Sequence, residues 1–318
     1  MVVLGSAIVC ISDMRKFWPP HIVISLPRLL VAGVVIAALF GGLALVHRGD
    51  IKASDRSTTH QVKRSSTEET EKPVQKVVWN YDEQAGAWKA SGTPPKCADP
   101  VFGRSPVDTA LATGVLYPGQ YRSKNYKPHG GWAFDNSQAT DVQVVMPMDA
   151  ELNGLVRYIE SGEIQYKVSF VTECGIAFYF DHLSALAPDF DKIAQTTPEP
   201  KVDDTRSDPW TTSYPFKEGD VIATASGHPA THNIAIDFGV LDYRQPNEIS
   251  KNPQWQALHQ TYKPSEWYGV CWFDLLPAAD GERSEALPNR DSTKSGVRSD
   301  YCANPLGTTL GVNGGNPV

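Results

Sequence analysis

Histidine and aspartate side chains recur between residues 129 and 237 in a pattern that could hold a metal ion. His129 and Asp135 lie in one segment, His182 in a second and Asp237 in a third. A catalytic zinc site needs three protein ligands, drawn from imidazole nitrogens, thiolates and carboxylate oxygens, and one open position for water. His129, Asp135 and Asp237 would supply one nitrogen and two oxygens, a set that shifts the preference toward harder metals.

These segments belong to an ordered set, which comprises residues 127–135, 145–150 with 154–156, 179–184, and 217–222 with 227 and 234–240. The set resembles the lysostaphin/LytM-type zinc metallopeptidases, which cut peptide cross-links in bacterial cell walls. The family pattern has an H-x-G-x-D element, a P-x-x-G-x-V hairpin, a Y-x-H-L-S strand, a G-D-x-I turn and an H-L-H-F-x-V strand. The resemblance covers roughly residues 115–242.

The resemblance implies a role for each of these residues. His129 matches the first zinc ligand, and Asp135 matches the second, although it lies six positions further on instead of four. His182 matches the histidine that handles the zinc-bound water, so the resemblance makes it the catalytic residue. Asp237 and Ala235 stand where the family has its H-x-H pair. The implied metal ligands are therefore His129, Asp135 and Asp237, with zinc as the cofactor of a degenerate centre.

Local geometry decides whether these residues can meet. Along an extended strand His129 and Asp135 would lie roughly 20 Å apart, so a turn at Gly130-Gly131 is required, where glycine accepts positive φ. His228 and His232 lie just before the last strand and are alternative ligands. Without the H-x-H pair, one group that handles the water or the oxyanion is missing, and such a loss lowers rates by orders of magnitude.

Ordinary structural roles are the alternatives for the same residues. His182 would be a half-buried histidine at a strand end. Asp237 would pair with Arg157 or Lys127 across the groove. Asp181 is discounted as a group that orients the His182 ring, because adjacent residues of a strand point to opposite faces.

The elements that carry these residues are predicted to be short strands. Apolar and alternating runs predict strands over 142–146, 154–159, 165–171, 176–180, 221–225 and 233–240. Their spacing of about ten residues, without helical crossovers, favours an antiparallel β domain. One short helix is predicted over 253–262. Within 233–240, alternation puts Ile236 and Phe238 on the core face and Ala235 and Asp237 on the groove face.

A second resemblance supports the fold type. Residues 146–156 and 218–222 are also similar to the barrel-sandwich fold of biotinyl and lipoyl carrier domains. Those domains present a lysine at a hairpin tip, and no lysine occurs between Thr172 and Pro188. The expected fold is therefore mostly β, an antiparallel sheet or barrel-sandwich domain of the LytM-like type, without a carrier function.

An apolar segment precedes this domain. Residues 29–46 lack charged groups and would span roughly 27 Å as a helix, which predicts a transmembrane helix. A cleaved signal peptide is the alternative. Residues 1–28 would be an N-terminal cytoplasmic segment and 47–95 a disordered linker. Residues 96–245 would be the LytM-like domain and 246–318 a C-terminal extension packed on it.

Cysteine usage and charge bear on the compartment. Cys97, Cys174, Cys271 and Cys302 permit two disulfides in three connectivities, and disulfides need an oxidising compartment. Four reduced thiols are the alternative. The lysine and arginine residues on the two sides of the predicted helix slightly favour an orientation with the C-terminal domain on the cytoplasmic side. The net charge of −7 excludes a basic field that attracts nucleic acid. We expect a single-pass membrane protein with an extracytoplasmic C-terminal domain.

The expected function follows from the resemblance and its departures. We expect a degenerate metallopeptidase domain that acts as a binding or regulatory module, with a cell-wall peptide or an envelope protein as partner. An active zinc-dependent cell-wall endopeptidase and a purely structural, disulfide-stabilised envelope domain are the alternatives. Clustering of the four predicted site residues would favour the enzyme, whereas an aromatic plug such as Trp132 in the groove would favour a binding module.

Overall fold

The computed structural model describes residues 76–122, 125–206, 209–290 and 299–305. This part of the chain is mostly β, with one ten-stranded sheet and two smaller two-stranded sheets. The predicted transmembrane helix over 29–46 and the predicted cytoplasmic segment 1–28 lie outside the described residues. Within the described ranges, no helix is both long and apolar enough to cross a bilayer.

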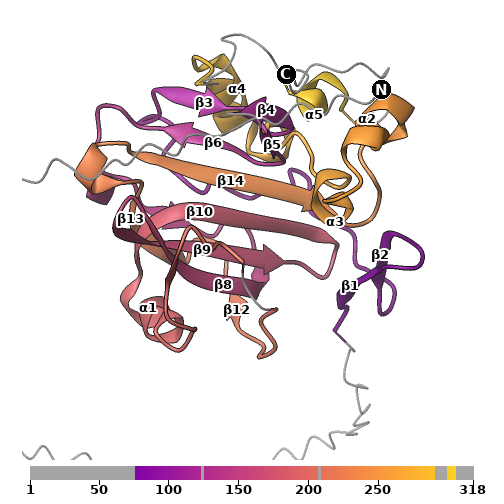
Figure 1. Cartoon of the computed structure of the whole chain (residues 1–318), viewed down its shortest axis with the longest axis horizontal. Helices are drawn as coiled ribbons and strands as arrows, with labels where there is room; N and C mark the ends of the chain where they lie inside the picture. The colour runs from indigo at the N-terminus through magenta and orange to yellow at the C-terminus, as the bar shows by residue number, and fades with distance from the viewer. Residues whose placement is uncertain (1–75, 123–124, 207–208, 291–298, 306–318) are drawn as a thin grey trace, which may run out of the picture. The chain divides into compact units, whose positions relative to one another are not determined.

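The central sheet has the strand order β11-β8-β9-β10-β14-β6-β3, of which Figure 1 labels β8 to β3. These strands are β3 (Gly114–Leu116), β6 (Gly130–Ala133), β8 (Ala150–Glu160), β9 (Glu163–Val171), β10 (Ile176–Leu186), β11 (Lys201–Val202) and β14 (Ala235–Asp242). Three further strands pair with members of this path, namely β7 (Val144–Val145), β12 (Pro215–Phe216) and β13 (Val221–Ser226). All these pairs are antiparallel except β11 with β8.

Two hairpins and several short helices complete the fold. The hairpins are β1 (Trp79–Asp82) with β2 (Ala87–Ala90), and β4 (Gln120–Arg122) with β5 (Asn125–Lys127). The α-helices are α1 (Pro188–Ala194), α2 (Pro253–Leu258), α3 (Lys263–Glu266), α4 (Ala278–Ala286) and α5 (Asp300–Ala303). The 3-10 helices are η1 (Ala139–Asp141), η2 (Pro229–Thr231), η3 (Ile249–Lys251) and η4 (Phe273–Leu275).

The predicted β character and antiparallel pairing are confirmed. Strands β7, β8, β9, β10, β13 and β14 overlap the six predicted ranges. The predicted helix over 253–262 begins at Pro253, where the Asn252 side chain accepts from the backbone N–H groups of Gln254 and Trp255. It ends earlier than predicted, because the backbone at His259 leaves the helical region.

The predicted linker over 47–95 requires a correction at its end. Residues 79–90 form the β1–β2 hairpin instead of a disordered tether. Trp88 stacks on Tyr243 with ring centroids 3.7 Å apart, and its indole N–H donates to the Pro264 carbonyl. The hairpin is ordered by aromatic packing against residues that are distant in the chain, which composition alone did not reveal.

Two disulfides are present, which the four cysteines from Cys97 to Cys302 permitted. Cys97 pairs with Cys174, and Cys271 pairs with Cys302. The second bond joins α5 to the segment before η4, both within the C-terminal region.

The central sheet has one aromatic face. Phe180 on β10 stacks on Phe238 of β14 with centroids 5.2 Å apart, and Trp132 of β6 stacks on Phe238 from the other side. All three rings are fully buried. The predicted core face of the last strand is therefore confirmed. Trp132 lies in this core, where its indole N–H donates to Ser284, and does not plug a groove.

The opposite face of the same strands is polar. Asp181 of β10 lies directly opposite Asp237 of β14 in the ladder, and Tyr179 lies opposite Gly239. Tyr158 of β8 reaches this face as well, because its hydroxyl donates to Asp181 at 2.6 Å. Side chains that alternate along a strand thus separate a hydrophobic core from a polar surface. The candidate site lies on this polar surface.

Candidate metal centre

The β8–β9 hairpin places two glutamates beside each other. Its turn residues Ser161 and Gly162 both have positive φ, 52° and 82°, as a type I′ turn requires. Glu160 and Glu163 flank the turn and are directly opposite each other in the ladder. Cross-strand partners lie on the same face of a sheet, so both carboxylates belong to the polar surface.

A bulge in β10 brings His182 to the same surface. The pairing of β10 with β9 shifts between Phe180 and Leu183, and His182 between them has a φ of 62°. Strict alternation would turn this ring toward the phenylalanine core. A positive φ in a residue other than glycine is uncommon and marks functional sites when the surroundings support it.

Asp181 stabilises this bulge. Its Oδ1 accepts the His182 backbone N–H at 2.9 Å and the Tyr158 hydroxyl, which itself lies 3.3 Å from His182 Nδ1. Asp181 therefore contacts the backbone of His182, and within the described residues no direct hydrogen bond joins it to the His182 ring. The bulge departs from the regular strand on which the prediction for Asp181 was based, because it lets the carboxylate hold the backbone N–H of the next residue.

His228 enters the site from the loop between β13 and β14. Its backbone N–H donates to the Asn233 carbonyl at 2.9 Å, which closes the loop around η2. The preceding residue, Gly227, donates its N–H to the His182 carbonyl at 2.7 Å. The loop is thus fixed against the bulge, and the His228 side chain is buried.

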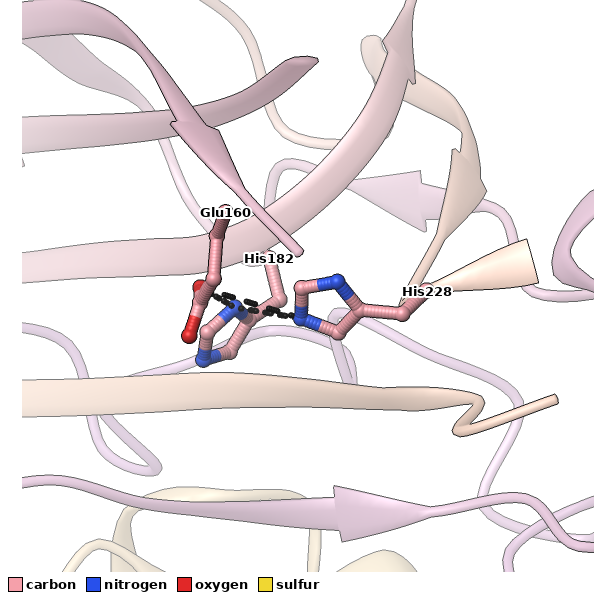
Figure 2. A group of neighbouring side chains, drawn as sticks. All are labelled: Glu160, His182 and His228. Carbon is pink, nitrogen blue, oxygen red and sulfur yellow. Dashed lines mark hydrogen bonds and ion pairs between the residues drawn. The ribbon is translucent and has the colours of Figure 1, made fainter. Parts of the chain in front are cut away.

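Glu160, His182 and His228 converge on one point (Figure 2). His182 Nδ1 lies 3.2 Å from Glu160 Oε2 and 3.3 Å from His228 Nε2, and the latter two atoms are 3.7 Å apart. A tetrahedral ion with ligand distances of about 2.0–2.1 Å has its ligand atoms about 3.3 Å from one another. These three residues could therefore hold a metal ion.

His182 also contacts, through its Nε2 atom, a second cluster that consists of Asp237, His129 and Tyr179. Asp237 Oδ2 lies 3.5 Å from His182 Nε2 and 2.9 Å from His129 Nε2. The Tyr179 hydroxyl is 3.0 Å from His129 Nδ1, so both ring nitrogens of His129 have partners. Tyr179 crosses Gly239, where a Cβ atom would lie 2.3 Å from the tyrosine ring.

The charged groups around His182 favour the protonated form of its ring. Burial lowers the pKa of His182, but hydrogen bonds from its ring to the carboxylates of Asp237 and Glu160 outweigh burial and raise this pKa well above its usual value. Burial raises the pKa of Asp237, but His129 and His182 outweigh it and lower this pKa well below the usual value. The hydrogen bond from His182 lowers the pKa of Glu160. Two ionised carboxylates thus surround His182.

The other two rings favour the neutral form. Burial lowers the pKa of His228, and the nearby charge of His182 lowers it further. Burial also lowers the pKa of His129, against the opposing effect of Asp237. A neutral imidazole is the form that binds metal ions, so His228 is suited to ligation.

The predicted site residues are only partly brought together. His129, His182 and Asp237 form one connected group, but Asp135 lies outside it. Gly130 and Gly131 are part of strand β6, whose extended backbone separates Asp135 from His129. The Asp135 carboxylate instead accepts from the Thr113 hydroxyl and pairs with Arg290.

The alternative partners predicted for Asp237 are not used in the described part of the chain. Arg157 donates to the side chains of Gln195 and Thr197 instead. Asp237 is held by two histidines, and its ion pairs are therefore part of the site.

Sequence reasoning missed Glu160 and identified His228 only as a substitute. The predicted strand ended at Ile159, one residue short of β8. The Ser-Gly pair at 161–162 between two strands was the available signal, because such a turn sets flanking residues opposite each other. His232, the other proposed substitute, is exposed at the end of η2.

Comparisons of this chain with models of known families, with curated proteins and with solved structures found no match. Its function must therefore be argued from the site itself.

Proposed function

We propose that this domain is a zinc-binding module of the cell envelope. In this proposal Glu160, His182 and His228 hold the ion, and its open position takes a donor group from a cell-wall peptide or an envelope protein. The convergence of one carboxylate and two imidazoles, with ligand atoms all within 4.8 Å of one another, carries the proposal. A His₂Glu set with one open position is a recurring zinc arrangement.

The neighbouring residues fit this role. Asp237 faces the Nε2 atom of His182 and can accept its proton, which leaves Nδ1 to face Glu160 and His228. A carboxylate behind a ligating histidine fixes its tautomer and raises its basicity. In this proposal Asp237 therefore supports a ligand and is not itself one, in contrast to the role implied by the family resemblance.

The proposed location rests on two observations. The disulfides Cys97–Cys174 and Cys271–Cys302 are typical of an oxidising compartment. The apolar segment 29–46 is long enough to anchor the chain in a membrane. The lysostaphin/LytM-like order of motifs, and with it the LytM-like fold type, supports a peptide of the cell wall as ligand.

Hydrolysis is the second candidate function. The open position beside the His182–Asp237 pair supports it, since a bound zinc ion polarises a carbonyl and activates water. Against it stands the second cluster, in which His129 is held on both nitrogens by Tyr179 and Asp237. That ring has no free nitrogen to accept a proton from a substrate. The binding function is therefore preferred.

The test is the zinc content of the purified full-length protein, measured by mass spectrometry, together with a zinc titration by calorimetry after chelation. We expect one ion for each chain in the wild type and none in Glu160→Ala. A wild-type protein that binds no zinc would refute the proposal. Soluble cell-wall peptides are then added, and retention without cleavage supports the binding module, whereas new peptide products support the hydrolase.

A further inference from the structure

Glu163 lies beside the proposed centre but is not a member of the ligand set. It is opposite Glu160 in the β8–β9 ladder, and its two carboxylate oxygens have different surroundings. Oε1 accepts the Ala230 backbone N–H at 3.1 Å, which ties the hairpin to the loop that carries His228. Oε2 is buried, has no hydrogen-bond partner in the described part of the chain, and lies 3.8 Å from His228 Nδ1.

The atom of His228 that faces Glu163 Oε2 also lacks a hydrogen-bond partner among the described residues. Nδ1 is buried and has no hydrogen-bond partner within the described residues, while Nε2 faces His182 and Glu160. The side chain of His228 is 8% exposed, so solvent does little to satisfy this nitrogen. A gap of 3.8 Å exceeds hydrogen-bond length by less than 1 Å. A small rotation of either side chain would close it.

The same hairpin holds the loop at a second point. Gln165 on β9 is fully buried, and its amide nitrogen donates to the Gly227 carbonyl at 3.2 Å. The carboxylate of Glu163 is thus anchored by Ala230, and the loop backbone is anchored by Gln165. The position of Oε2 relative to the His228 ring is therefore a consequence of the fold.

We propose that Glu163 is a positioning residue that accepts a hydrogen bond from the Nδ1–H group of His228 and thereby presents Nε2 of that ring to the metal. This inference rests on the proposed zinc site. A neutral imidazole carries one proton, and the nitrogen that bears it cannot bind a metal. An acceptor at Nδ1 selects the tautomer in which Nε2 is free, and partners of this kind typically change metal affinity by about 10–100-fold.

Glu163→Gln is the variant that isolates this role. The glutamine carbonyl can still accept from the Ala230 N–H, and its NH₂ group then faces His228 Nδ1. A donor at that place favours the opposite tautomer, with the proton on Nε2. Glu199→Gln is the matched control, because Glu199 is an exposed residue in the loop between α1 and β11.

The experiment has two measurements on the purified full-length protein. The tautomer of His228 is determined without metal from ¹⁵N chemical shifts after selective histidine labelling, with His228→Gln to assign the signal. Zinc affinity is measured by calorimetry. We expect the Nδ1–H tautomer in the wild type, the Nε2–H tautomer in Glu163→Gln, and zinc binding weakened about 10–100-fold in that variant alone.

Results that contradict these expectations distinguish a failure of the role proposed for Glu163 from a failure of the proposed zinc site. A wild-type His228 that carries its proton on Nε2 would overturn the role of Glu163, even if the variant failed to fold. Unchanged zinc affinity in Glu163→Gln, beside normal binding by the wild type, would overturn it and leave the zinc site intact. Absence of zinc binding by the wild type would refute the zinc site, and the tautomer measurement would still decide whether Glu163 orients the ring.

Discussion

Two histidine–glutamate pairs in this molecule have similar distances and different surroundings. His259 Nδ1 lies 2.7 Å from Glu266 Oε2, and His182 Nδ1 lies 3.2 Å from Glu160 Oε2. The side chains of the first pair are 2% and 6% exposed, and the His259 ring stacks on Trp255 with centroids 4.1 Å apart. The side chains of the second pair are 24% and 38% exposed.

The difference separates a structural pair from a candidate site. The His259–Glu266 pair is enclosed by aromatic rings and joins the end of α2 to α3. The His182–Glu160 pair lies at a bulge and a hairpin tip, reaches solvent, and has a further histidine and a further carboxylate within reach. Contact between histidine and glutamate is therefore not itself a functional signal. Convergence of several ligand atoms at an accessible point is the stronger indication.

Breaking the enclosed pair should have the largest effect on folding. Glu266→Ala leaves Nδ1 of the buried His259 without its hydrogen-bond partner, and an unsatisfied buried polar group costs about 1–3 kcal/mol. We expect a decrease of this size in the free energy of unfolding, measured by denaturant titration, with zinc affinity unchanged. A variant that lost zinc binding while remaining folded would show that the two pairs are not independent.

Removing a ligand from the accessible site should act mainly on metal binding. We expect His228→Ala to weaken zinc binding by at least about 100-fold, beyond the range seen for outer partners of metal ligands. Its metal-free stability should fall by about 1 kcal/mol. The matched control is His232→Asn, since His232 is exposed and asparagine tolerates its positive φ. Equal zinc affinity in all three proteins would remove His228 from the site.

Metal removal tests the same distinction without mutation. Zinc at about 100 times its dissociation constant should stabilise the folded protein by about 2.7 kcal/mol. For a domain of this size the midpoint of thermal unfolding should rise by roughly 5–10 °C. A chelator should reverse the increase in the wild type, and His228→Ala should show neither change. An increase retained in His228→Ala would place the ion elsewhere.

The smallest effect is expected in the second cluster. Tyr179→Phe removes the hydroxyl that contacts His129 Nδ1, and loss of one such hydrogen bond costs about 1 kcal/mol. Zinc affinity should change by less than about 10-fold, because His129 and Tyr179 act through Asp237. A loss as large as that of His228→Ala would mean that His129 ligates the metal.

Local patterns predicted much of the sheet. In β14 the buried Ile236 and Phe238 alternate with the partly exposed Ala235 and Asp237, as their spacing indicated. Side-chain alternation is a local property of an extended backbone, so one strand is enough to reveal it. The four cysteines from Cys97 to Cys302 likewise permitted two disulfides, although three connectivities were open.

The site was less predictable because it depends on departures from regular strands. Asp135 was expected beside His129, yet Gly130 and Gly131 belong to the extended strand β6 and make no turn. Glu160 and Glu163 meet only because two positive-φ residues close their hairpin. His182 points to the polar face only because β10 contains a bulge. None of these features follows from the spacing of apolar residues.

The sequence by itself determined the strand-rich architecture, the two faces of the last strand and a group of candidate residues that included His182. The tertiary structure alone decided which of them meet, how the cysteines pair, and that Glu160 and His228 lie beside His182. The physical reason is the range of the interactions. Hydrophobic periodicity acts along one segment, whereas ligand convergence depends on register, a bulge and a loop contributed by distant segments.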